Sequence, residues 1–160
     1  MDNLIAVCNN HLAAVQAVGA LKEQNHLTSK QLSIIGKADK ARNAIILDDD
    51  DVSKVTTTEA GIGVALGSAL GILTGVGIFA IPGLGFLYGA GALIGGIAGF
   101  DLGLIGGGIV SALTVAGIKI NETHSYDEDI KQGKFLVVVQ GTKEVVNAAK
   151  STLEKMDGVE

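Results

Sequence analysis

The sequence predicts an α+β protein: a split ferredoxin-like α/β sandwich interrupted by a long glycine-zipper helical hairpin. Three observations lead to this prediction. Segments with strand-like and helix-like patterns alternate at both ends of the chain. The middle of the chain, residues 60–118, holds a single charged side chain, Asp101. Glycine recurs there at four-residue intervals, and on a helix such residues share one face.

The charge distribution divides the chain into three segments. All 12 Lys and Arg side chains lie outside residues 60–118. We therefore assign 1–53 to the first half of an α/β domain and 119–160 to its second half. Residues 54–118 form the hydrophobic hairpin between them.

The first half begins with a strand–helix–strand pattern. The apolar run Leu4–Cys8 predicts a buried strand. Asn9 or Asn10 can then cap a helix over 11–25, whose apolar stripe contains Leu12, Val15, Val18 and Leu21. A second strand is predicted over 31–38. A weaker one is predicted over 44–47, before the acidic run Asp48–Asp51.

The second half is predicted to contain helix, strand and helix. A short polar helix over 121–133 is closed by a glycine, and 134–140, with its unbroken apolar run, is the clearest strand. The last helix covers 142–156, with Thr142 as its cap and an exposed ion pair between Lys150 and Glu154.

Neither half can bury a sheet alone, but together they can make a ferredoxin-like sandwich. The fourth strand of that fold is open. Any strand after the last helix is short, because the chain ends at Glu160, and the segment 44–47 is the alternative.

Length and glycine spacing distinguish the hydrophobic middle from an ordinary core. Residues 60–81 exceed the ~20 apolar residues that a membrane-spanning helix needs, and Pro82 and Gly83 then break the helix and form the hairpin turn. Nine glycines would form two packing faces for close approach of another helix: Gly63, Gly67, Gly71 and Gly75 before the turn, and Gly91, Gly95, Gly99, Gly103 and Gly107 after it. The alternative is a buried hairpin in a soluble homo-oligomer.

Asp101 is the one charge in this segment. At the centre of a spanning helix it would cost about 2.5–3.5 kcal/mol. We therefore expect the chain to kink or reach the surface near Asp101. The alternative is an intramembrane polar site that binds a proton or a cation, or pairs with another subunit.

Four stretches of the sequence resemble a known family. They are IAVCNNHLAAVQAVGALKEQNHLTSKQLSII in the first half, IPGLG at the hairpin turn, and YDEDIKQGKFLVVVQ and VVNAAKSTLEKMDG in the second half. This arrangement is similar to that of bacterial general-stress (heat-induced stress) proteins. The resemblance implies the strand–helix–strand start, the small-residue insert and a stress context, and it supplies no catalytic residue.

The sequence offers no enzyme site. Cys8 and His11 straddle the junction of a strand and a helix, and His26 and His124 do not complete a zinc site with them. The run Asp48–Asp51 lacks the spacing of a calcium loop, and no glycine stretch has the Lys and Ser or Thr of a phosphate-binding loop. We expect no catalytic, cofactor or metal residues.

Charge and cysteine content constrain the partners. The net charge of −5 and the absence of a basic stripe argue against nucleic acid, and no small-molecule substrate is evident. A single cysteine excludes internal disulfides. We expect a non-enzymatic protein at the bacterial inner membrane, with the α/β domain in the cytoplasm, that associates with the bilayer and with its own copies. A soluble cytoplasmic shell or filament is the alternative.

Overall fold

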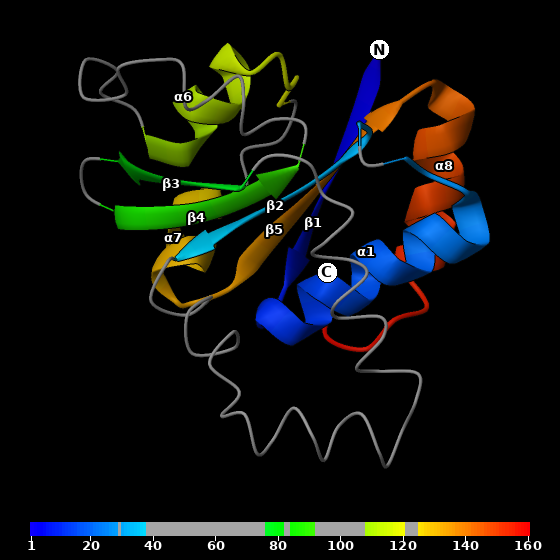
Figure 1. Cartoon of the computed structure of the whole chain (residues 1–160), viewed down its shortest axis with the longest axis horizontal. Coiled ribbons are helices and arrows are strands. Elements are labelled where there is room, and N and C mark those ends of the chain that lie inside the picture. The colour runs from blue at the N-terminus through cyan, green and yellow to red at the C-terminus, as the bar shows by residue number, and fades with distance from the viewer. Residues whose placement is uncertain (29, 38–75, 82–83, 92–107, 121–124) are drawn as a thin grey trace.

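The computed structural model describes residues 1–28, 30–37, 76–81, 84–91, 108–120 and 125–160 (Figure 1). The α+β class is confirmed. The described residues form five strands and four helices, in the order β1 (Asp2–Cys8), α1 (His11–Asn25), β2 (Leu32–Lys37), β3 (Val76–Ile81), β4 (Gly85–Gly91), α6 (Gly108–Val115), α7 (Tyr126–Lys131), β5 (Phe135–Gly141) and α8 (Lys143–Leu153).

The strands make one sheet in the order β1-β5-β2-β4-β3. Every neighbouring pair is antiparallel. Since β1 and β2 both run antiparallel to β5, they run parallel to each other, with β5 between them. The first strand–helix–strand unit therefore skips one position in the sheet, and the strand predicted from the second half of the chain fills it. The two halves form one sheet.

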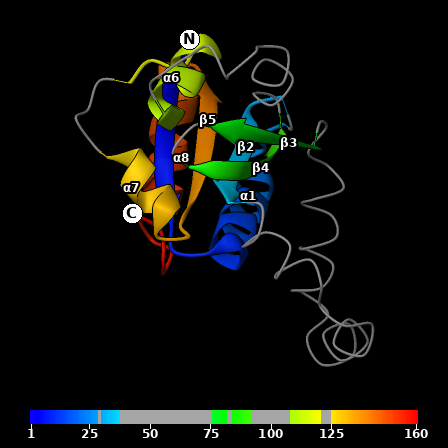
Figure 2. The ribbon, with the colours of Figure 1, turned by 90° about the vertical axis from the view of Figure 1, so that its left-hand side faces the viewer.

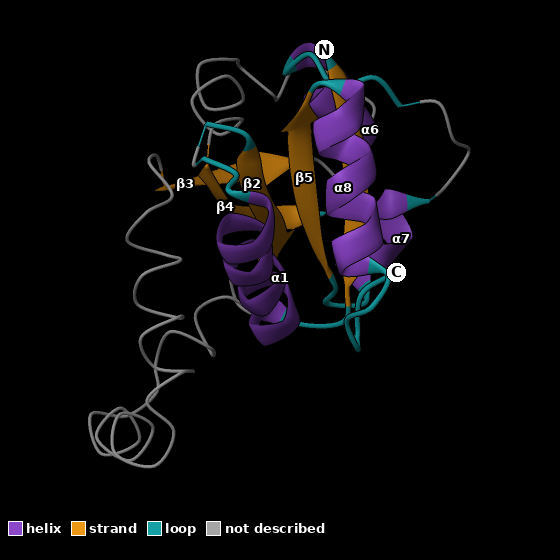
Figure 3. Ribbon diagram, turned by 90° about the vertical axis from the view of Figure 1, so that its right-hand side faces the viewer, coloured by secondary structure: helices purple, strands orange, loops and turns teal. Residues whose placement is uncertain are grey.

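Helices cover both faces of the sheet. Helices α1 and α8 pack on one face with Ile34, Phe135 and Val137, and Figure 3 shows both helices in front of the strands. Helices α6 and α7 pack on the other face with Ile35, Leu136 and Val138, opposite α1 in Figure 2. Because β5 is buried on both faces, its apolar run is unbroken rather than alternating.

Local signals at the two ends of the chain are confirmed. Asn10 caps α1 by accepting from the N–H of Ala13 at 2.8 Å, and Thr142 caps α8 through the N–H of Val145. Lys150 and Glu154 form the predicted exposed ion pair. Capping depends on a few consecutive residues, so sequence alone is sufficient to locate it.

The end of the chain adds to the sheet beside β1. Val7 and Glu160 exchange two backbone hydrogen bonds of 2.8 Å, and Asn9 donates to the carbonyl of Gly158 at 2.9 Å. Val159 thereby forms a bridge with Cys8. This single bridge lies in the last residues of the chain, where the sequence left a short strand open. Lys134 also binds Glu160, at 3.7 Å, and Asp129, at 3.2 Å, and so ties the terminus to α7 and β5.

The prediction of helix around the hairpin turn was wrong. Val76–Ile81 and Gly85–Gly91 are strands that pair from Val76↔Ala90 to Ile81↔Gly85. Pro82 and Gly83, which follow β3 in the sequence, lie outside the described residues. In addition, β4 pairs with β2, between Ser33↔Gly91 and Lys37↔Leu87. Pairing with the edge of β2 therefore stabilises Gly85–Gly91 as a strand, although the glycine spacing alone favours a helix.

The predicted stripe of α1 was also wrong at one position. Leu12 is 45% exposed, whereas His11 is only 5% exposed. The buried face begins with His11 and continues through Ala14, Val15, Val18 and Leu21. The four-residue and seven-residue steps from His11 to Val15 and Val18 place them on one side of the helix.

Candidate functional site

Most of the predicted packing residues lie outside the described part of the chain. These are the turn residues Pro82 and Gly83, the polar residue Asp101, and eight of the glycines: Gly63, Gly67, Gly71, Gly75, Gly95, Gly99, Gly103 and Gly107. The weak strand over 44–47, the acidic run and His124 also lie outside it.

Gly91 is the described member of the glycine set, and its role differs from the predicted one. It is the last residue of β4, with φ of 112°. A Cβ at this position would collide with the carbonyl oxygen of Leu32 and would lie 2.7 Å from the Cα of Ser33. Gly91 therefore allows two strand backbones to approach closely, rather than two helices.

The last part of the predicted hairpin is a helix packed on the sheet. Ile109, Ala112 and Leu113 of α6 are buried together with Ile118. The N-terminus of α6 is capped from a distance, because the carboxylate of Asp127 accepts a hydrogen bond of 2.8 Å from the N–H of Ile109. Within the described ranges, no helix is both long and apolar enough to span a bilayer.

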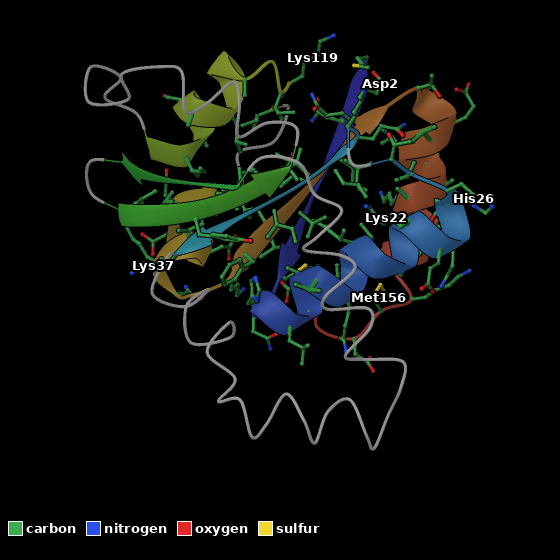
Figure 4. All side chains as sticks on the ribbon, in the orientation of Figure 1. Asp2, Lys22, His26, Lys37, Lys119 and Met156 are labelled. Atoms are coloured by element: carbon green, nitrogen blue, oxygen red, sulfur yellow. The ribbon has the colours of Figure 1, made fainter. Side chains whose placement is uncertain are left out.

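Lys119, which follows α6, is hydrogen-bonded to Asn3 of β1. The side-chain amide of Asn3 donates to the carbonyl of Lys119 at 2.9 Å and accepts from the N–H of Lys119 at 3.0 Å. One side chain thus satisfies both backbone groups of Lys119, as a neighbouring strand would. Lys119 and Asp2, the neighbour of Asn3, lie at the same end of the molecule in Figure 4.

The most unusual polar group on the α1 face is His11. Its Nε2 atom is buried and has no hydrogen-bond partner. The imidazole lies between two rings: its centroid is 5.1 Å from that of Phe135 and 5.9 Å from that of Tyr88, at steep interplanar angles. Burial lowers the pKa of His11 and raises the pKa of Tyr88, because each group loses hydration of its charged form.

Cys8 is buried within the same cluster. Burial raises the pKa of its thiol to about 12, so at neutral pH it is a protonated, weakly nucleophilic group. In the part of the chain that the structure describes, no three His, Cys, Asp or Glu side chains gather as a metal site would require.

Lys22 is the second described residue with a buried, unpartnered nitrogen, at its Nζ atom. Burial lowers the pKa of this amine. Lys22 lies on the half of α1 that ends at Asn25, two turns or more from His11. The two orphaned nitrogens are therefore separate features and do not form one site.

Sequence reasoning missed the burial of His11. A signal was present, because His11 lies four residues before Val15 and seven before Val18, on the stripe that those residues define. The more hydrophobic Leu12 was assigned to the stripe instead. Residue type thus outweighed periodicity in the prediction, and the structure follows periodicity.

Comparison with protein-family models, with curated proteins and with solved structures found no match to this chain.

Proposed function

We propose that this protein is a non-enzymatic, self-associating protein of the stress response that acts at a membrane through its glycine-rich insert. The observation that carries the proposal is the segregation of charge: residues 60–118 hold one charged side chain, whereas both flanking segments are rich in charge. A stretch this apolar needs lipid or protein around it. The resemblance to bacterial general-stress proteins supports the stress context.

We further propose that the α/β part is a ferredoxin-like unit. Its support is the place of β5 between β1 and β2, the packing of α1 and α8 on one face, and the pairing of Val159 beside β1. In this proposal the insert lies between the second and third strands of the unit, and β3 and β4 extend the sheet.

The ends of the insert bear on its topology. Ile35 pairs with Leu136, so the end of β2 and the start of β5 are neighbours. The chain therefore leaves the sheet after β2 and returns to the same sheet at β5, so both flanking halves lie on one side of any membrane. Any bilayer crossing between them must be matched by a return, and an even number of crossings follows. Asp101 would then lie where the chain bends at the membrane surface.

A second candidate is a soluble homo-oligomer whose glycine-rich segments pack on each other. The β3–β4 hairpin favours it, because Val76–Ile81 and Gly85–Gly91 are strands of the sheet. The remaining glycines then fall in two shorter segments, 60–75 and 92–107. As a straight helix each would measure about 24 Å, less than the ~30 Å of a bilayer core.

Fractionation of native, untagged protein tests the proposal. Membranes would be washed with carbonate, extracted with detergent, and the extract sized. We expect the protein to remain with membranes through carbonate and to require detergent. A large, uniform particle in the soluble fraction would instead support the homo-oligomer. A soluble monomer would contradict both.

A further inference from the structure

His11 connects the first helix to the glycine-rich insert. It is the first residue of α1, and its ring contacts Tyr88 of β4. Strand β4 belongs to the insert, whereas α1 and Phe135 belong to the flanking halves of the chain. The imidazole therefore contacts both the α/β unit, at Phe135, and the β3–β4 hairpin, at Tyr88.

This contact suits a neutral imidazole and not a charged one. Nε2 has no acceptor, and the first turn of α1 has no acidic residue. The positive end of a helix dipole also disfavours a cation at that position. The two rings offer only a cation–π attraction, which is weak beside the hydration that a buried imidazolium loses.

The described residues around His11 supply no compensating charge. In the cluster on this face the other titratable groups are Cys8 from β1 and Tyr88 from β4, both neutral at pH 5 to 8. β2, β5 and α8 contribute apolar side chains to it. Among the described residues one carboxylate is buried, Asp129, and it belongs to α7 on the opposite face. The end of the chain, near Asn9, carries Asp157 and Glu160, and both are exposed.

We propose that His11 forms an acid-sensitive contact, here called the His11 pin, that holds the β3–β4 hairpin against α1. Uptake of a proton by the imidazole weakens the contact with Tyr88 and the pairing of β4 with the rest of the sheet. Loosening this contact would make the insert more available for association at mildly acidic pH, and this last step rests on the proposed function. In this proposal His11 neither binds a metal nor takes part in catalysis.

The direction of the pH effect follows from linkage. The released histidine titrates near pH 6.5, and the pinned one titrates lower because it is buried. The released state therefore binds more protons below about pH 6.5. The contact keeps its full strength above that pH and weakens as pH falls toward the lowered pKa, by up to tenfold in the release equilibrium per pH unit.

The direct test is a titration of the full-length wild-type protein by NMR. The imidazole resonances of His11 would be followed from pH 8 to 5, with exposed His26 as an internal reference. His26 lies at the other end of α1 (Figure 4). We expect the midpoint of His11 to fall below the ordinary histidine value of about 6.5. A His11 midpoint at or above about 6.5 would overturn the proposal.

Amide hydrogen exchange tests whether the loosening is local. Protection at Leu87 and Tyr88 would be compared with protection at Val137 and Val138 of β5, after correction for the intrinsic pH dependence of exchange. Between pH 6.5 and 5.5 we expect protection in β4 to fall by up to tenfold and protection in β5 to change less. An equal fall in both strands would show global destabilisation and would contradict a pin that acts on the hairpin.

Two variants complete the test. His11→Phe keeps an aromatic ring but cannot be protonated, and we expect it to abolish the extra loss of β4 protection at pH 5.5. His26→Asn is the matched control, which removes an exposed histidine from a left-handed position that Asn tolerates. Its profile should follow the wild type. If His11→Phe also follows the wild type, the proposal fails; if it does not fold, the wild-type titration still decides.

Association is measured separately from release. Sedimentation with and without vesicles would be repeated at pH 7.5 and 5.5. Release of β4 together with increased sedimentation supports both the pin and the proposed function. Release of β4 in a protein that associates with neither vesicles nor its own copies would leave the pin intact and contradict the proposed function.

Discussion

The Oδ1 atom of Asp127 lies 2.8 Å from the backbone nitrogen of Ile109 and accepts its hydrogen bond. The donor is in the first turn of α6, and the acceptor belongs to α7, 18 positions later in the chain. A cap supplied by another helix aligns the two helices that cover the second face of the sheet. It also leaves no space for a side chain at Gly108, where a Cβ would collide with the Asp127 carboxylate.

Replacing Asp127 should therefore destabilise the protein through α6. We expect Asp127→Ala to lower the free energy of unfolding by about 1 kcal/mol, the usual cost of losing a capping side chain. Asp127→Asn, which keeps an oxygen acceptor, should lose less. Urea unfolding followed by circular dichroism measures both. Equal losses in the two variants would show that the carboxylate charge, rather than the hydrogen bond, holds α6.

Gly91 and Gly19 allow a matched comparison of two glycine-to-alanine substitutions. Gly91→Ala should lower the free energy of unfolding by more than about 1 kcal/mol, because its Cβ would meet the backbone of β2 and its φ of 112° suits glycine. Gly19 lies within α1 with nothing within 4 Å of an added Cβ, so Gly19→Ala should be neutral or stabilise by up to ~1 kcal/mol. Thermal unfolding of both variants checks the contrast. A tolerated Gly91→Ala would show that β4 does not need this close approach to β2.

The thiol of Cys8 should be unreactive in the folded protein. Its pKa of about 12 leaves almost no thiolate at pH 8, and the residue is buried. Iodoacetamide should modify Cys8 at pH 8 only after urea unfolds the chain, as mass spectrometry would show. The folded pKa lies above the ordinary value of 9.0, so this thiol stabilises the fold fully below pH 9. That contribution is lost as pH rises from 9 toward 12. Rapid labelling of the native protein would contradict the burial of Cys8.

The glycine-packing proposal predicts a specific loss of assembly. We expect Gly67→Leu combined with Gly99→Leu to reduce the size of the detergent-extracted or soluble assembly, because two bulky side chains would prevent close approach. The α/β part should keep its unfolding transition. Gly19→Ala is the control. An unchanged particle size in matched detergent would count against packing through these glycines.

Several features of the fold follow from neighbouring residues alone. The strand before α1, the Asn10 cap, the strand from Phe135 and the Thr142 cap each depend on a short stretch of sequence, and all were predicted. The site was harder to predict. His11 is polar, and only its position on the stripe with Val15 and Val18 marks it as buried. Which rings it meets depends on β4 and β5, far away in the sequence.

The sequence by itself determined the alternation of elements at the two ends, the helix caps, and the separation of a nearly uncharged middle from charged flanks. The tertiary structure decided that Val76–Ile81 and Gly85–Gly91 form strands. A four-residue spacing of glycines is close to one helical turn of 3.6 residues and is also two full repeats of a strand, so spacing cannot choose between them. The open edge of β2, which bonds to β4, makes the choice, and the sequence does not show where that edge will lie.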